Sequence, residues 1–336
     1  AGKNIHDPGF GDKNIDLISV NDEMISEFKH KGYLEPLEKN VMTEEVRDSF
    51  PQKYLESICE ENGHIYSVPF QMDIMMFWVN QELLKQAGLD EIKNTGDFDI
   101  LQKSLKNPDQ YAYGDAWENT HVYNSLSQFV NFWGGDYFDW TDPKTKDAAR
   151  YMKSMLDEKN TSPAQFVDQY EQMEEKFIRG KYGCVFMYTS ALGTFLDADV
   201  YGKNKIHMAP LPVLHKKKAT NIATWQYVLN NASENKDAAV RFLQYAAGYE
   251  GSTEYAKIMK SYPARVDVIE NEDIDLEGID MIRKYLREYT LNARPLCENS
   301  MGAVSDMGKL FQGYVLGQCE EDSFFEQAQN CINTYY

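Results

Sequence analysis

The sequence predicts an α/β protein with two lobes. Its 336 residues exceed the about 100–200 that commonly form one domain, so two domains are expected. Short apolar segments typical of strands alternate with amphipathic segments typical of helices. A polar break at Gln71-Met72-Asp73 lies between two β-type segments, which suits a crossing from one lobe to the other.

The composition excludes several classes of protein. With 43% hydrophobic and 26% charged residues, the chain is globular rather than disordered. A formal charge of −19 argues against a nucleic-acid partner, because binding a phosphate backbone depends on clustered Lys and Arg. No segment approaches the ~18–20 consecutive apolar residues of a membrane helix. No export signal stands at the start of the given sequence, so we expect such a segment either to have been removed or not to have been part of this sequence.

The cysteines and histidines give no sign of a metal or cofactor site. The five cysteines lack CxxC or CxxH spacing, which argues against a zinc site. Their odd number leaves at least one thiol unpaired. We therefore expect neither a metal nor a cofactor. The cysteines are Cys59, Cys184, Cys297, Cys319 and Cys331.

The first predicted strand covers residues 14–20 and is followed by three polar residues, Asn21, Asp22 and Glu23. A helix is predicted next, because the apolar residues that follow recur at helical spacing. In open α/β sheets ligands bind beyond the carboxyl ends of strands, so this triplet is placed like a binding site. The alternative is that these residues only cap the helix.

The segment from residue 63 to 89 predicts strand, break, strand and helix. Proline has no N–H for a ladder, so Pro69 is expected to end the first strand before a second one at 74–79. A carboxylate at Asp73, among apolar neighbours, needs a partner. Asn80 is a suitable N-cap for the following helix, and Gly88 suits its C-terminal end.

Three segments of the chain resemble the extracellular solute-binding proteins of ABC importers, in particular the carbohydrate-binding group, family 1. The first has the form G-x-I-Y-x-V-P-F followed by N-x-x-L-x-x-A-G-L, within residues 63–89. The others are ATWQYVLNN and the helix after it, from residue 223, and YPARVDV at 262–268. The resemblance implies a periplasmic-binding-protein-like fold of type II, with three crossings at its hinge.

The crossings are expected near residues 71–73, 223–226 and 263–266. Lobe 1 would then comprise residues 1–71 and 230–264, and lobe 2 residues 74–225 and 268–336. The resemblance also implies an opening strand-helix-strand unit that the sequence lacks before residue 14, so lobe 1 is expected to be incomplete at its N-terminus.

The resemblance further implies a function. A sugar or oligosaccharide would bind in the cleft between the lobes and pass to the ABC permease subunits in the membrane. The protein would be a monomer, at the extracellular face of the cytoplasmic membrane, where it is lipid-anchored, or in the periplasm.

Sugar recognition needs aromatic faces and side chains that exchange hydrogen bonds with hydroxyls. The leading candidates are Asp73, Trp117, Tyr188, Trp225 and Arg265. Tyr188 stands where the family usually carries a Gly-Ser-Trp-like element. Trp225 could instead pack in a core, and Arg265 could form a surface ion pair. Further candidates are Gln71, Glu118, Arg294 and Glu298, beside the triplet at 21–23.

Two other functions are compatible with the sequence. Asp73 and Glu118 could act as the acid and base of a glycoside hydrolase, which uses a pair of carboxylates. No known hydrolase motif accompanies them, so we expect no catalysis. The same fold could also bind a polyamine or a peptide, which the acidic balance permits.

Overall fold

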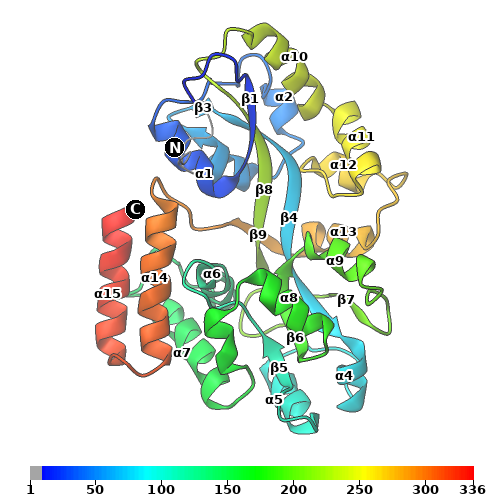
Figure 1. The fold of residues 1–336 in the computed structure, drawn as a ribbon, viewed down its shortest axis with the longest axis vertical. Coiled ribbons are helices and arrows are strands. Elements are labelled where there is room, and N and C mark those ends of the chain that lie inside the picture. The colour runs from blue at the N-terminus through cyan, green and yellow to red at the C-terminus, as the bar shows by residue number, and fades with distance from the viewer. Residues whose placement is uncertain (1–9) are drawn as a thin grey trace. The chain divides into compact units, whose positions relative to one another are not determined.

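The computed structural model describes residues 10–336 (Figure 1). The chain forms two compact units. Unit 1 comprises the chain up to Asp73, Ile222–Arg283 and Leu296–Ser300. Unit 2 comprises Ile74–Asn221, Lys284–Pro295 and Met301–Tyr336. No helix in the described part of the chain has the length and apolar character needed to cross a bilayer.

Two long strands, helix α13 (Ile279–Glu288) and the first residue of helix α14 (Ser300–Val315) contain boundaries between the units. The chain leaves unit 1 between Asp73 and Ile74, within strand β4 (Ser67–Asn80), and returns between Asn221 and Ile222, within β8 (Ala219–Leu229). It leaves again within α13, and residues 296–300 rejoin unit 1.

The predicted third crossing at residues 263–266 is wrong, because the chain stays in unit 1 as far as Arg283. Backbone hydrogen bonds explain the difference. The amide of Met72 donates to the carbonyl of Tyr262 at 3.0 Å, and the amide of Ala264 donates to that of Phe70 at 3.1 Å. The segment 262–264 therefore runs beside the unit 1 end of β4 instead of leaving it.

The predicted break in the segment 63–89 is also wrong. β4 runs without interruption from Ser67 through Pro69 to Asn80. Proline removes only its own donor, and the neighbouring amides of the strand, such as Met72, still find carbonyl partners. The helix after it is confirmed, because Asn80 Oδ1 accepts hydrogen bonds from the amides of Glu82 and Leu83 at the start of α4 (Gln81–Gln86).

In unit 1, β1 pairs antiparallel with β8, and the register places Leu17 opposite Leu229 and Asn21 opposite Trp225. A small hairpin turns at Asn62 and Gly63, which both have positive φ. The remaining elements are β1 (Leu17–Asn21), α1 (Asp22–His30), α2 (Glu44–Arg47), α3 (Gln52–Tyr54), a π-helical turn (Leu55–Cys59), β2 (Glu60–Glu61), β3 (His64–Ile65), α10 (Lys236–Ala247), α11 (Tyr249–Met259) and α12 (Val266–Glu270).

In unit 2, β4 pairs antiparallel with β6 and β7, and β6 pairs in parallel with β5. All seven residues of β6 are buried, as its continuous apolar composition predicts. The elements are α5 (Thr95–Ser104), β5 (Tyr111–Gly114), α6 (Val122–Trp133), α7 (Pro143–Asp157), a 3-10 helix (Pro163–Val167), α8 (Tyr170–Ile178), β6 (Tyr182–Tyr188), α9 (Ala191–Asp197), β7 (Ile206–Ala209), β9 (Thr290–Ala293), α14 (Ser300–Val315) and α15 (Glu321–Tyr335).

Candidate ligand-binding site

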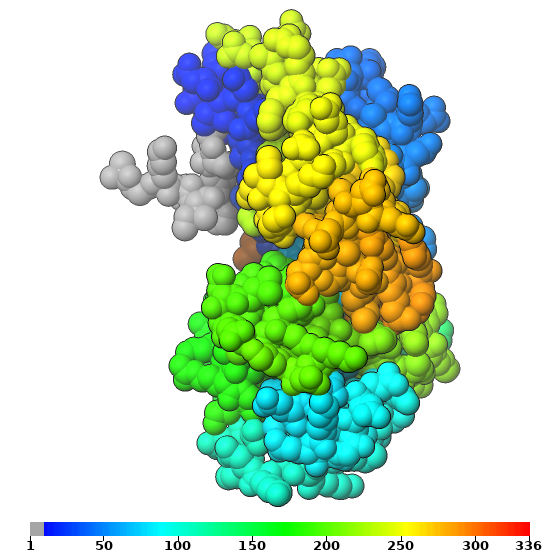
Figure 2. All heavy atoms as spheres, turned by 90° about the vertical axis from the view of Figure 1, so that its right-hand side faces the viewer, coloured from blue at the N-terminus to red at the C-terminus, as the bar shows by residue number. Residues whose placement is uncertain are grey.

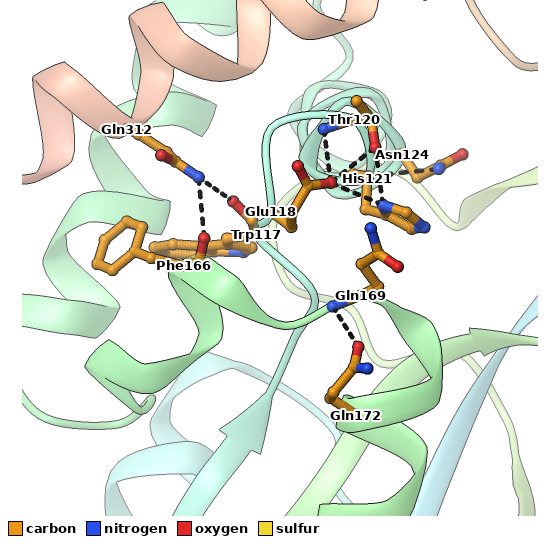
Figure 3. A network of polar contacts seen from close by, with 9 residues as sticks. All are labelled: Trp117, Glu118, Thr120, His121, Asn124, Phe166, Gln169, Gln172 and Gln312. Atoms are coloured by element: carbon orange, nitrogen blue, oxygen red, sulfur yellow. Dashed lines mark hydrogen bonds and ion pairs between the residues drawn. The ribbon is translucent and has the colours of Figure 1, made fainter.

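The loop between β5 and α6 in unit 2 holds Glu118 in a fixed position. Glu118 Oε2 accepts hydrogen bonds from the amide of Thr120 at 2.9 Å and from its hydroxyl at 2.6 Å. His121 Nδ1 lies 3.0 Å from the same oxygen. Figure 3 shows these side chains gathered at the start of α6, with the side chain of Gln169 turned toward His121. A quarter of the Glu118 side chain is exposed to solvent.

The surroundings of Glu118 favour its charged form. Partial burial raises the pKa of this carboxyl, but the hydrogen bonds from Thr120 and His121 outweigh burial and lower the pKa below its ordinary value. Glu118 is therefore an ionised acceptor at neutral pH. A carboxylate of this kind forms strong hydrogen bonds with hydroxyl or ammonium donors.

Two further predicted residues, Tyr188 and Arg294, contact the first turn of α6, and both are buried. Tyr188, at the end of β6, donates a hydrogen bond to Asn124 Oδ1 at 2.9 Å. The guanidinium of Arg294 lies 5.9 Å from the centre of the Tyr188 ring and donates to the hydroxyl of Tyr123 at 2.7 Å. The ring of Tyr170 packs edge-on against Tyr188, with 5.9 Å between ring centres.

Tyr170 also joins this group to Glu118. Its ring lies 5.3 Å from the ring of His121, which contacts the Glu118 carboxylate. We call these residues the α6 cluster: Glu118, His121, Asn124, Tyr170, Tyr188 and Arg294. The structure thus brings together three predicted site residues, Glu118, Tyr188 and Arg294, which lie far apart in the sequence.

The first residues of β8 anchor the helix that carries part of the α6 cluster. Gln128, which is fully buried, donates to the carbonyl of Ala219 at 2.8 Å and accepts from the amide of Asn221 at 3.0 Å. Asn221 donates in turn to the hydroxyl of Ser127 at 2.7 Å and to the carbonyl of Asn124 at 3.2 Å. This buried hydrogen-bond network of Gln128 and Asn221 fixes α6 against the sheet.

Trp117 does not offer its ring to a ligand. It is fully buried, and its indole Nε1 donates to Asp115 Oδ2 at 2.8 Å. Phe166 and Phe311 pack against it edge-on, at 5.5 and 5.3 Å between ring centres. The absence of a helical pattern around Trp117 favoured a site role, but a core indole with a hydrogen-bonded N–H fits its surroundings better.

Asp115 is the centre of that core and was not predicted from the sequence. Its carboxylate accepts hydrogen bonds from the hydroxyls of Tyr113 and Ser125, from Trp117 and from the amide of Ala116. Burial raises the pKa of Asp115, against the lowering effect of these bonds. The carboxylate binds the loop to β5 and α6, and so positions the neighbouring Glu118.

Helix α14 supports the same loop from its other side. Gln312 donates hydrogen bonds to the carbonyls of Trp117 at 2.6 Å and Phe166 at 3.1 Å (Figure 3). Gly308 lies so close to the loop that an added Cβ would stand 2.0 Å from the carbonyl oxygen of Asn119. The packing therefore requires glycine at position 308.

In unit 1, the predicted residues Asn21, Glu23 and Trp225 lie near one another. Asn21 and Trp225 are opposite in the β1–β8 ladder, and Asn21 Nδ2 donates to Glu23 Oε2 at 3.1 Å. Asn21 stands at the N-cap position of α1, yet its side chain makes no capping bond, and its Oδ1 is buried without a hydrogen-bond partner. Helix capping therefore does not explain this asparagine. Trp225 is 42% exposed, so it is not a core residue.

Asp22 lies apart from its two neighbours, in the interior of unit 1. It is fully buried and accepts a hydrogen bond from the Tyr54 hydroxyl at 3.0 Å. That hydroxyl also contacts Thr224 Oγ1 at 2.7 Å and accepts from Gln226 Nε2 at 3.1 Å. Asp22 belongs to a buried polar network that links α1 to β8.

Gln71 and Asp73 lie two residues apart on β4. Gln71 Oε1 accepts a hydrogen bond from the Tyr255 hydroxyl at 2.7 Å. Asp73 is buried. Burial raises the pKa of Tyr255, and the charge of Asp73 adds to this rise. Gln71 and Asp73 thus both interact with Tyr255 of α11, within unit 1.

Arg265 is committed to contacts inside unit 1. Its guanidinium forms a bidentate ion pair with Asp267, at 2.6 and 3.0 Å, and donates to the Ala247 carbonyl and the Ser49 hydroxyl, both at 2.8 Å. The ion pair expected as the alternative is present, but the arginine is buried rather than on the surface. Glu298 pairs with His30 at 3.5 Å and keeps 57% of its side chain exposed.

Several residues of the α6 cluster were missed from the sequence. His121 and Asn124 follow Glu118 at spacings of three and six, where the turn before a helix brings them close, and this spacing was a usable signal. Tyr170 had none, because it comes from a separate helix. Within residues 10–336, no group of His, Cys, Asp and Glu side chains is arranged to hold a metal ion.

A family model described as bacterial extracellular solute-binding protein matches residues 11–253. The chain belongs to this family. Two curated relatives of this solute-binding protein are a probable amino-acid ABC transporter periplasmic-binding protein of Sinorhizobium fredii, 24% identical over 68% of the chain, and the arabinooligosaccharide-binding protein of Bacillus subtilis, 22% identical over 77%. The chain spans 54% and 62% of the length of these relatives, which is less than two thirds.

Solved structures show that the solute-binding protein has the two-lobed fold predicted from its sequence. A solute-binding protein of Thermotoga lettingae bound with alpha-D-tagatose has a TM-score of 0.80 and 18% identity, covering 95% of this chain and 84% of its own. Maltose-bound MalE3 of T. maritima has a TM-score of 0.79 and 16% identity, covering 96% and 85%. At these identities the likeness concerns the fold alone.

Proposed function

We propose that this solute-binding protein is the extracytoplasmic substrate-binding component of an ABC importer, and that it binds a sugar or oligosaccharide through the α6 cluster. One observation carries the proposal. An ionised carboxylate, two tyrosine rings and a guanidinium lie together at the start of α6, held there by buried hydrogen bonds.

This combination suits the chemistry of a pyranose. Glu118 accepts hydrogen bonds from ring hydroxyls, and Arg294 donates to hydroxyl or ring oxygens. The partly exposed ring of Tyr170, which packs against the buried Tyr188, offers apolar surface to the C–H faces of the sugar. In unit 1, we propose that the exposed Trp225 stacks on a sugar ring and that Asn21 Oδ1, buried without a partner, accepts a hydroxyl.

The similar proteins support a saccharide more than other ligands. The structures with similar folds hold alpha-D-tagatose and maltose, and one of the two relatives is named for an arabinooligosaccharide. The other relative is named for an amino acid, so polyamines and peptides, which also contain nitrogen, are tested as alternative ligands beside saccharides. We further propose that the protein acts as a monomer outside the cytoplasmic membrane, lipid-anchored or in the periplasm, and delivers its ligand to a permease.

We propose that the bound saccharide is not hydrolysed. A glycosidase needs a carboxylic acid with a raised pKa to protonate the leaving group. The pKa of Glu118 is lowered by its hydrogen bonds, which suits an acceptor of hydroxyls and not an acid. Incubation with oligosaccharides should therefore release no product, and hydrolysis that Glu118→Gln abolishes would overturn this part of the proposal.

A thermal-shift screen tests the ligand class. A ligand that binds only the native state stabilises it by RT ln(1 + [L]/Kd), about 2.7 kcal/mol at a concentration of 100 Kd. Monosaccharides, maltose- and arabinose-type oligosaccharides, polyamines and short peptides form the panel. We expect the midpoint to rise with a saccharide and the rise to shrink in Glu118→Gln. A rise with polyamines or peptides alone would overturn the saccharide assignment.

A further inference from the structure

Unit 1 has a pocket of about 220 Å³ among β4, β8, α10 and α11, separate from every residue of the α6 cluster. Helices α10 and α11 lie on the face shown in yellow-green and yellow in Figure 2. The volume is below the about 300–1,000 Å³ of sites for drug-sized ligands, but above the 150 Å³ cavity that holds a benzene. It therefore suits a small ligand.

Half of the ten residues that line the pocket are aromatic, and their rings lie at different angles to one another. Phe70 and Tyr227 are stacked, with 4.1 Å between ring centres and 19° between planes. Tyr255 stands at 77° to Phe70, and Phe242 stands at 77° to Tyr227. The ligand would thus meet both the faces and the edges of rings.

The pocket is open to solvent at aromatic residues. Phe242 is 46% exposed and Tyr245 is 50% exposed. Holding such large rings half exposed costs the free protein the burial that they would gain in its core. A ligand that covers them recovers part of that free energy.

The charge of the pocket selects the kind of ligand. Glu254 is the charged side chain among its described lining residues, and its nearest cation, Lys257, is 3.7 Å away on the same helix and is itself more than half exposed. Aromatic faces carry partial negative charge and attract cations, most strongly quaternary ammonium groups that are weakly hydrated. A carboxylate beside them adds to this attraction.

The polar groups of the wall do not suit a sugar. The Ser252 hydroxyl donates to the Ala246 carbonyl, and the Tyr255 hydroxyl donates to Gln71. The Glu254 carboxylate and the hydroxyls of Tyr227 and Tyr245 remain, which are fewer than the hydroxyls that a sugar would bury, and each hydroxyl without a partner carries a cost. A trimethylammonium group has no N–H or O–H and needs none.

We propose that this pocket is a second binding site, for a small organic cation of the trimethylammonium type, held by the rings of Phe70, Tyr227, Phe242 and Tyr245 and by the carboxylate of Glu254. The site is independent of the saccharide site proposed above. Its ligand is recognised by shape and charge, without directed hydrogen bonds.

Titration calorimetry of the full chain with choline tests the proposal, with 3,3-dimethylbutan-1-ol as its neutral isostere. We expect choline to bind at least about tenfold more tightly than the alcohol, and the affinity to fall with added salt. Glu254→Gln should weaken choline binding at least about threefold, and Tyr245→Leu about as much. Glu250→Gln, on the same helix outside the pocket, is the matched control and should leave it unchanged.

Three results would overturn the proposal. The first is that choline at tens of millimolar gives no heat of binding. The second is that the neutral alcohol binds as tightly as choline. The third is that choline binds Glu254→Gln and Tyr245→Leu as tightly as it binds the native protein. Glu118→Gln separates the two sites, because it should weaken saccharide binding and leave choline binding as it is. Circular dichroism on each variant checks that the fold is retained, which the half-exposed positions of Tyr245 and Glu254 favour.

Discussion

Two tryptophans show how the same residue type takes opposite roles in this protein. Trp117 is fully buried, and its N–H bonds the Asp115 carboxylate. Trp225 is 42% exposed on a strand whose two neighbours in sequence, Thr224 and Gln226, point into the buried network of unit 1. Alternation along β8 therefore turns Trp225 outward, where a ligand can reach it.

Trp225→Ala should weaken saccharide binding by about 1–3 kcal/mol if the ring stacks on the ligand as proposed, and should leave stability nearly unchanged because the ring fills no core. Calorimetric Kd values and thermal midpoints of both proteins measure the two effects. Trp117→Ala is the comparison, with an expected loss of roughly 3–5 kcal/mol of stability from a buried cavity. A collapsed midpoint in Trp225→Ala would identify that tryptophan as structural.

Glu118 should make the stability of unit 2 depend on pH. Its folded-state pKa is lowered, so its hydrogen bonds stabilise the protein above the ordinary value of 4.5 and are lost as pH falls through the folded value. The difference in thermal midpoint between the native protein and Glu118→Gln should thus be present at neutral pH and shrink on acidification. Glu82→Gln, exposed on α4, serves as control. A difference that grows toward low pH would contradict this reading of the pKa.

At the scale of elements, the loop that carries Glu118 is held by helices remote in sequence. Gln312 of α14 bonds the Trp117 carbonyl, and Gly308 of α14 touches Asn119. Ring contacts of Phe311 and Tyr314 with Phe324 hold α14 against α15, beside which it runs (Figure 1). The C-terminal helix pair is therefore part of the support of Glu118.

Gly308→Ala should displace the Glu118 loop, because the new Cβ would stand 2.0 Å from the Asn119 carbonyl oxygen, which is backbone and cannot rotate away. We expect about 1–3 kcal/mol lower stability and at least about tenfold weaker saccharide binding, measured by chemical unfolding and calorimetry.

Gly313→Ala on the same helix is the matched control for this change. Its Cβ would meet only the flexible Gln318 side chain, at 3.9 Å. Alanine is favoured over glycine within a helix by up to about 1 kcal/mol, so stability should stay or rise and binding should not change. Equal effects of the two substitutions would show that helix propensity, and not the loop contact, decides the outcome.

At the scale of the whole molecule, all five cysteines are free thiols, and four of them are buried. Burial raises the pKa of Cys59 to about 12 and that of Cys184 well above its ordinary value. The thiolate is the reactive form, so these thiols are inert in the folded state. Their exposure reports unfolding of unit 1 through Cys59 and of unit 2 through Cys184.

In the native protein near pH 8, one thiol, the partly exposed Cys319, should react rapidly with an aromatic disulfide reagent, and all five should react in denaturant. Absorbance of the released thiolate counts them. Cys319→Ser should remove the rapid phase. A second rapid thiol in the native protein, or a rapid phase that survives in Cys319→Ser, would contradict the burial of the other four.

The sequence by itself determined the α/β character, the family and much of the local structure of this protein. Periodicity and capping depend on residues near in sequence, which is why the strand around residue 18, the helix capped by Asn80 and the buried strand β6 were predictable. Burial, charge state and strand continuity depend on partners far away. Only the tertiary structure could show Phe311 covering Trp117, Tyr262 pairing with the strand at Met72, and Tyr170 joining Tyr188 to the carboxylate of Glu118.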